Sequence, residues 1–354
     1  MKKFFLGMEN ELLIVKETED GYNTTAHLEG THPTQLVVDP NNSNIIYCAT
    51  YGNGLWKSNN AGDSWLAIGN MNAYHEPVSD KGIDSAHITA IAIHPSNSNT
   101  IYVGTEPSKI YYSLDAGYTF TEFKEIQNLR SKPFWQHPPR PHTNHIQWIT
   151  PSFRNDDCIN IAVEFGAFIN TFDHGYKWND RNFLSPKDIH TLLAHPNSPG
   201  RLYAACGDGL LMEGNSYAES KDEGLSWHYM SKGLEAHPYL YSMAINSQRP
   251  NDRIVSASKS ALEAHHKDIE NLTNHSTIYR KQDEESWEEI SNGLPCEGSF
   301  IHQLESDPIE DNVFYALNNF GLFKYSSERN YWNKINFNWK KQYNEQHPSF
   351  LVVI

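Results

Sequence analysis

Ser113-Leu-Asp-Ala-Gly-Tyr-Thr-Phe120 is one of four octapeptides with the pattern Ser/Thr-x-Asp/Asn-x-Gly-x-x-aromatic, and the others span residues 58–65, 171–178 and 220–227. The hydroxyl and the Asp or Asn side chain can accept hydrogen bonds from backbone N–H groups of their own turn. The glycine permits a backbone conformation that a Cβ would penalise, and the aromatic ring can pack beneath the turn. The pattern predicts a repeated structural turn, and we assign no chemistry to its Asp residues.

The sequence around each octapeptide has the pattern of a small four-stranded sheet. In residues 87–126 an apolar stretch with small residues at 87–93 precedes a Pro-Ser-Asn turn, and further strands are expected at 100–105, 109–113 and from 120. Two later segments, 281–287 and 326–332, keep the final Trp but lose the Gly. A repeat of about 45 to 60 residues suits four-stranded blades with long loops.

The octapeptide resembles the Asp-box, or BNR repeat, of sialidase-like β-propellers in the WD40/YVTN/BNR-like group. This resemblance implies an all-β fold, and we expect one seven-bladed β-propeller domain over residues 1–354. The expected blades are at about 31–70, 87–126, 145–184, 189–232, 239–292 and 300–337, with a seventh from 347–354 plus 2–27.

The seventh blade is expected to clasp the two ends of the chain. Residues 347–354 end in an apolar strand without neighbours, and residues 3–7 and 11–15 form two strands without an innermost one. An open propeller would leave strand edges unpaired. We therefore predict that strand 350–354 pairs with strand 3–7.

Composition and charge indicate which partners and which cellular location to expect. The formal net charge of −15 argues against nucleic acid and anionic membranes as partners. No apolar run approaches the length of a transmembrane helix, and acidic residues interrupt the apolar start of the chain, which argues against a signal peptide. The four cysteines, Cys48, Cys158, Cys206 and Cys296, lack metal-ligand spacing. We expect free thiols and a cytoplasmic protein.

Long segments fall on one face of the expected propeller, at residues 70–86, 127–144, 207–215, 259–274 and 340–346. Insertions concentrated on one face mark a binding face. Trp135-Gln-His-Pro-Pro-Arg-Pro-His-Thr-Asn-His145 is the segment richest in functional side chains, and it leads into an expected innermost strand. We predict an axial pocket lined by histidines and carboxylates on this face.

Two kinds of chemistry fit these side chains. Imidazole with carboxylate suits zinc, manganese or iron, so a divalent metal is one option, with His145, His190 and Glu164 as ligands. Acid–base chemistry on a sugar needs two carboxylates across a pocket. The catalytic candidates are Glu164, Asp188, His190 and Asp208. The candidate substrate contacts are Trp135, Arg140, Arg181, Tyr239 and His265.

The sequence argues against a true sialidase. Sialidases hold the substrate carboxylate with three arginines, one of them in an early Phe-Arg-Ile-Pro-like segment, and this chain has no Arg before Arg130. The chain resembles uncharacterised bacterial BNR-repeat proteins described as glycosyl hydrolase-like. Through the octapeptide alone, it also resembles photosystem assembly factors and xyloglucanase propellers. A hydrolase or lyase with a small-molecule or carbohydrate ligand is one hypothesis. A non-catalytic scaffold for protein partners, using Phe134, Trp135, Tyr239 and Tyr241, is the alternative.

Overall fold

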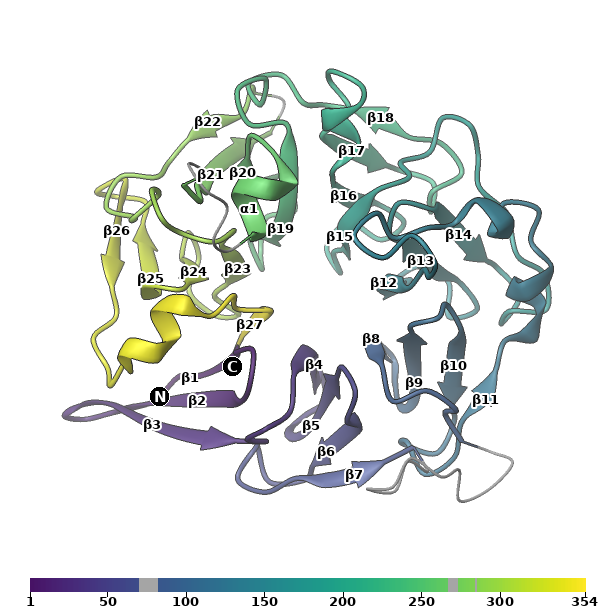
Figure 1. The fold of residues 1–354 in the computed structure, drawn as a ribbon, viewed down its shortest axis with the longest axis horizontal. Coiled ribbons are helices and arrows are strands. Elements are labelled where there is room, and N and C mark those ends of the chain that lie inside the picture. The colour runs from purple at the N-terminus through teal and green to yellow at the C-terminus, as the bar shows by residue number, and fades with distance from the viewer. Residues whose placement is uncertain (70–81, 267–272, 284) are drawn as a thin grey trace. The chain divides into compact units, whose positions relative to one another are not determined.

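The computed structural model describes residues 1–69, 82–266, 273–283 and 285–354. Residues 70–81 and 267–272 belong to two of the long segments expected on the binding face, and Glu284 belongs to the degenerate octapeptide at 281–287. These residues lie outside the described part of the chain. In the described part the strands form seven sheets (Figure 1).

Four sheets take their strands from the N-terminal half of the chain and its last residues. In spatial order they are β27 (Phe350–Val353), β1 (Lys3–Gly7), β2 (Leu12–Thr18) and β3 (Gly21–His27); β4 (Pro33–Asp39), β5 (Asn42–Thr50), β6 (Gly54–Ser58) and β7 (Leu66–Ile68); β8 (Ile88–His94), β9 (Asn97–Thr105), β10 (Ile110–Ser113) and β11 (Thr121–Glu122); and β12 (Ile146–Pro151), β13 (Ile159–Val163) and β14 (Ala167–Thr171).

The other three sheets follow along the chain. They are β15 (Ile189–Ala194), β16 (Leu202–Cys206), β17 (Tyr217–Ser220) and β18 (His228–Tyr229); β19 (Tyr239–Ile245), β20 (Asp252–Ser258), β21 (Thr277–Gln282) and β22 (Glu288–Glu289); and β23 (Gln303–Ser306), β24 (Phe314–Asn318), β25 (Gly321–Ser326) and β26 (Tyr331–Lys334). The short helices are α1 (Ala261–His265), η1 (Lys124–Asn128), η2 (Lys132–Phe134), η3 (Asp208–Leu210) and η4 (Lys341–Glu345).

The prediction of an all-β chain with seven blades is therefore confirmed.

The chain divides into two compact units, one of Met1–Glu29, Ala205–Ala218 and Tyr229–Ile354 and one of Gly30–Ala204 and Glu219–His228. The single domain expected from the sequence stays a prediction. None of the helices in the described residues is long and apolar enough to cross a bilayer. All four cysteines are free.

The four octapeptides share one hydrogen-bond network, as their pattern predicts. In the second copy, the Ser113 hydroxyl donates to Asp115 Oδ1 at 2.8 Å and accepts from Gly117 N–H at 2.9 Å. Asp115 Oδ1 also accepts from Thr119 N–H at 2.9 Å. The equivalent bonds recur in the copies that begin at Ser58, Thr171 and Ser220. The octapeptide is thus a self-contained turn.

Glycine is required in this turn for two reasons. Gly175 has a φ of 87°, which disfavours any residue with a Cβ. A Cβ there would also lie 2.3 Å from the Phe123 ring of the preceding sheet. The same ring packs edge-on against Trp178, the final residue of this octapeptide, with centroids 5.6 Å apart. The turn therefore packs between two neighbouring sheets, as expected for its aromatic residue.

One sheet departs from the expected four strands. After β14 the chain makes only an isolated bridge between Asn170 and Asn179. The next residue, Asp180, accepts hydrogen bonds from both the backbone N–H and the hydroxyl of Ser131. The described residues of this sheet therefore form three strands, and the segment after Asn179 is bonded to Ser131 instead.

The two chain ends meet in one sheet (Figure 1). β1 pairs antiparallel with β27, with Phe4 opposite Val353 and Gly7 opposite Phe350. Backbone hydrogen bonds of 3.0 Å join Lys3 and Ile354 in both directions. The predicted clasp is confirmed, and it supplies β1 with the partner that its edge needs.

A half-buried carboxyl group on β23, that of Glu305, escaped the sequence reasoning. Burial raises the pKa of Glu305 to about 7, although its Oε1 accepts a hydrogen bond from Ser306 N–H at 2.9 Å. A carboxyl group whose folded-state pKa is raised favours the folded state at low pH. This contribution is fully present below the unfolded pKa and is lost as the pH rises through about 7.

We expect deletion of residues 348–354 to lower the free energy of unfolding by several kcal/mol, because the β1–β27 ladder and the burial of Phe350 and Leu351 are lost. Thermal and urea unfolding measure the loss. A synthetic peptide of the deleted residues should restore part of it. An unchanged melting temperature in the truncated chain would contradict the clasp.

Asp115→Ala should lower the free energy of unfolding by about 1 kcal/mol, since the turn loses the acceptor of Thr119 N–H. Asp20→Ala, in the exposed turn between β2 and β3, is the matched control and should have little effect. If Asp115→Ala abolished ligand binding at unchanged stability, the structural role of the octapeptide would be wrong.

Glu305→Gln should stabilise the protein above pH 7 and change little near pH 5, because the amide never has to carry a buried charge. Urea unfolding at the two pH values measures the difference. Glu328→Gln, on an exposed turn, is the control. An equal effect of Glu305→Gln at both pH values would show that this carboxyl group is not the titrating one.

Candidate functional site

The turn between β13 and β14 carries the central carboxylate of the candidate site, Glu164, as the sequence pattern predicts. Gly166 N–H closes the turn by donating to Val163 O at 3.1 Å. A Cβ on Gly166 would lie 2.9 Å from Val163 Cγ1 and 3.2 Å from the Trp135 ring. Glycine therefore lets the indole pack directly on the turn, which fixes the position of Glu164.

Two histidines come from the loop that precedes β12. This loop folds back on itself, because His137 N–H donates to Thr143 O at 3.0 Å and Arg140 N–H donates to His137 O at 2.8 Å. His145 is the last residue before β12 and is 6% exposed. His137 is thus held by local backbone hydrogen bonds within the loop, and His145 is placed by the start of β12.

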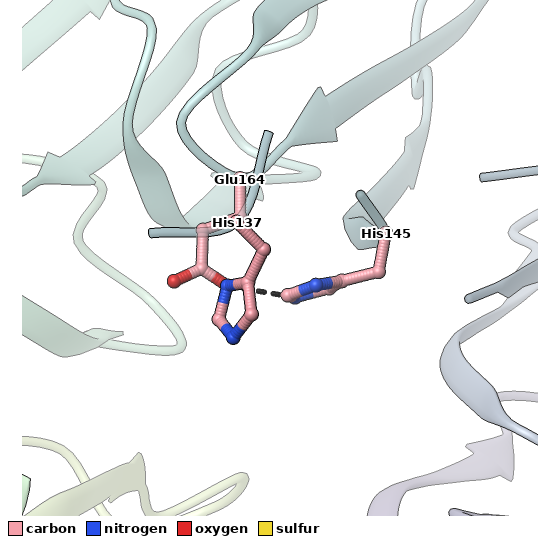
Figure 2. A group of neighbouring side chains, drawn as sticks. All are labelled: His137, His145 and Glu164. Atoms are coloured by element: carbon pink, nitrogen blue, oxygen red, sulfur yellow. Dashed lines mark ion pairs between the residues drawn. The ribbon is translucent and has the colours of Figure 1, made fainter. Parts of the chain in front are cut away.

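The two imidazoles and the carboxylate converge (Figure 2). His145 Nε2 lies 2.6 Å from Glu164 Oε2 and 2.9 Å from Gln147 Oε1. His137 Nδ1 lies 3.5 Å from the same Glu164 oxygen, and the two imidazole rings meet edge-on with centroids 4.8 Å apart. One carboxylate oxygen therefore has two imidazoles as neighbours.

Electrostatics favour the charged forms of this pair. Burial, the largest single cause, would lower the pKa of His145, but Glu164, Gln147 and Glu106 together outweigh it and raise that pKa above its usual value. Burial would likewise raise the pKa of Glu164, yet the neighbouring imidazoles hold it well below its ordinary range. The two groups thus stabilise each other's charges inside the protein.

A second pair lies beside Glu164, at the start of β15. His190 Nε2 is 3.5 Å from Asp188 Oδ1, and His190 is 2% exposed. Asp188 Oδ1 also accepts a hydrogen bond of 3.2 Å from Phe165 N–H, in the turn that carries Glu164. Glu164, Asp188 and His190 each offer a ligand atom, and these atoms lie within 4.8 Å of one another.

The donor set fits a divalent transition metal. The ligand atoms of His137, His145 and Glu164 also lie within 4.8 Å of one another. Nδ1 of each histidine is buried and has no hydrogen-bond partner among the described residues. Buried polar atoms normally have partners, and imidazole with carboxylate is a donor set that zinc, manganese and iron accept. His145, Glu164 and His190, the expected ligands, all belong to these two groups.

Arg140 approaches the same cluster through Glu106. The Arg140 guanidinium donates to Glu106 Oε2 and to the Tyr51 hydroxyl, both at 2.7 Å. Glu106 Oε2 lies 3.9 Å from His145 Nδ1. The Arg140 side chain is 40% exposed, so its cation remains accessible beside the buried histidine.

Trp135 and Arg181 have structural contacts. The Trp135 ring is 4% exposed, and its indole N–H donates to Ser131 Oγ at 2.8 Å. The ring packs in the core, which gives no support to its expected stacking on a sugar. Arg181 donates to Gly166 O at 3.1 Å and lies over the Phe134 ring. It therefore braces the turn that carries Glu164. Ligand contacts of both residues stay predictions.

The remaining expected site residues, Asp208, Tyr239 and His265, belong to the other compact unit. Asp208 begins η3. The Tyr239 hydroxyl lies 2.9 Å from His265 Nε2, and His265 Nδ1 lies 2.8 Å from His347 Nε2. Tyr239 is 5% exposed and packs in the core with Ala264 and Ile301. Their roles in one site with Glu164 stay predictions.

Sequence reasoning missed His137 and Gln147 as members of the cluster. His137 lies in a proline-rich loop, where no strand register indicates the direction of a side chain. Gln147 lies on β12 two residues after His145, so the alternation of strand side chains could have placed it beside that histidine.

Comparison with known proteins identifies related sequences over part of the chain. No known protein-family pattern matches the sequence. A xyloglucanase from Paenibacillus sp. is 36% identical over a 100-residue alignment that covers 25% of this chain and 10% of the xyloglucanase. The chain therefore matches only about a tenth of the length of this relative.

Solved structures share the fold more widely. An ancestral GH74 enzyme has a TM-score of 0.61 at 19% identity and covers 87% of this chain, which spans 39% of that enzyme. YCF48 bound to D1 peptide has a TM-score of 0.52 at 15% identity, with 88% of this chain and 87% of that chain covered. The chain is thus a seven-bladed β-propeller that resembles GH74 enzyme structures in fold.

Proposed function

We propose that the protein is a carbohydrate-active β-propeller that binds a divalent metal at His137, His145 and Glu164 and cleaves a glycosidic bond as a hydrolase or lyase. The proposal rests on one observation. One carboxylate oxygen of Glu164 has two imidazoles beside it, and both imidazoles keep a buried Nδ1 without a hydrogen-bond partner among the described residues. The match to part of a xyloglucanase supports a carbohydrate as the substrate class.

Each group of the cluster has a distinct part in the proposed chemistry. A zinc, manganese or iron ion, when bound, supplies Lewis-acid polarisation or an activated water. Glu164 and the two histidines hold it, and Gln147 orients His145 through the 2.9 Å contact. Asp188 and His190, 3.5 Å apart, accept and return a proton. Arg140 orients substrate oxygens at the exposed side.

The remaining expectations from the sequence extend this proposal. The octapeptides are Asp-box repeats with a structural role, and the enzyme is not a sialidase. Arg181, in the same compact unit as Glu164, is a further substrate contact. The acid–base role of Asp208 and the substrate contacts of Tyr239 and His265, which belong to the other compact unit, stay predictions from the sequence. The four free thiols support a cytoplasmic location.

A non-catalytic scaffold is the second candidate. YCF48, which resembles this chain over most of both lengths, was solved with a bound peptide. Phe134 is 66% and Phe183 is 85% exposed, and both lie within the compact unit that contains Glu164. Trp135 and Tyr239, two of the four aromatic residues expected on a docking surface, are buried and weaken this candidate.

We expect untagged protein to carry zinc, manganese or iron in elemental analysis and to lose it in Glu164→Gln. The variant removes the charge that binds the ion and leaves the shape of the side chain unchanged. Chelation should abolish cleavage of plant-type polysaccharides, and the metal should restore it. Reducing ends indicate a hydrolase, whereas ultraviolet absorbance from unsaturated ends indicates a lyase.

His228→Ala is the matched control, because His228 is exposed on β18 and outside the cluster. It should leave both metal content and cleavage unchanged. Metal content that survives in Glu164→Gln would contradict the proposed site. A metal-free wild-type protein that still binds a peptide through Phe134 and Phe183 would favour the scaffold.

A further inference from the structure

The ligand atoms around Glu164 form two groups, and a single ion cannot contact both. Glu164 with His137 and His145 makes one group, and Glu164 with Asp188 and His190 makes the other. Ligands at about 2.0 to 2.2 Å from one ion can be at most about 4.4 Å apart, on opposite sides of it. Within each group the ligand atoms lie within 4.8 Å of one another, whereas the ligand atoms of all five described residues do not.

We infer that this site holds two divalent metal ions bridged by Glu164. His137 and His145 bind the first ion, and Asp188 and His190 bind the second. This inference rests on the proposed function, which requires only one ion, and it assigns Asp188 and His190 as ligands rather than as a separate acid–base pair. Two-metal sites place their ions about 3.5 to 4 Å apart, a distance that one carboxylate can bridge.

The local structure ties both halves of this centre to one turn. Gly166 N–H donates to Lys187 O at 2.8 Å, and Phe165 N–H donates to Asp188 Oδ1 at 3.2 Å. The turn that presents Glu164 is therefore joined to the segment that presents Asp188. The first half is joined to the second through Gln147, whose amide donates to His190 O at 3.3 Å and whose Oε1 lies 2.9 Å from His145 Nε2.

The number and charge of the ligands suit a reactive centre. Each ion has three protein ligands when Glu164 is shared, which leaves positions open for water or substrate. Two bound divalent ions would exceed the charge of the Glu164 and Asp188 carboxylates, and they would supply Lewis-acid polarisation and an activated water, the chemistry that hydrolysis or proton abstraction requires.

Manganese titration of chelator-treated protein tests the inference. We expect two Mn²⁺ per chain by calorimetry and an electron paramagnetic resonance spectrum in which exchange coupling broadens the six-line signal of isolated Mn²⁺. Asp188→Asn should bind one Mn²⁺ and show the uncoupled six-line signal. Glu164→Gln should lower the affinity for both ions, by about tenfold or more.

The possible outcomes separate this inference from the proposed function. One Mn²⁺ per wild-type chain, lost in His145→Gln but kept in Asp188→Asn, would overturn the two-ion centre and leave the single-metal proposal standing. No bound Mn²⁺, zinc or iron would overturn both. His228→Ala should keep two ions, and the coupling measured on the wild type does not depend on whether any variant folds.

Discussion

Each innermost strand has one edge without a partner strand, and its backbone carbonyl groups still need donors. In the compact unit that contains Glu164, side chains supply them from one sheet to the next. Thr34 donates to Ile88 O at 2.8 Å, and Thr89 donates to Ile146 O at 2.7 Å. Gly104 lacks a Cβ where one would lie 2.5 Å from Ile146. Neighbouring sheets can therefore approach closely while their edges remain satisfied.

This constraint decides where reactive side chains can lie. Small polar residues on the innermost strands are committed to the neighbouring carbonyl groups, so the ionisable groups gather at turns and strand beginnings, as Glu164 and His145 do. Gln147 takes part both in the contacts between neighbouring sheets and in the candidate site. Its amide group donates to His190 O, and its carbonyl oxygen contacts His145. The same side chain thus supports the sheet packing and orients a candidate ligand.

The fold was predictable because local turn chemistry repeats along the chain. The octapeptides fix their turns through bonds within eight residues, and apolar alternation fixes the strands between them. The candidate site was predictable where strand register applies, at His145, Glu164, Asp188 and His190. It was not predictable in the loop before β12, where tertiary packing buries Trp135 and turns His137 toward Glu164. The absence of a fourth strand after β14 in the described residues was not predictable either, and there Asp180 bonds to Ser131, which is distant in sequence.

The pairing of β1 with β27 has a consequence for synthesis. β1, β2 and β3 leave the ribosome first, and β27 is made after every other strand of this chain. Throughout translation the open edge of β1 is a template on which a neighbouring nascent chain could add a strand. This edge is covered only when β1 pairs with β27, which is very distant in sequence. Contacts of such large sequence separation form late and slowly. Chaperone demand during expression should therefore concentrate on the first three strands.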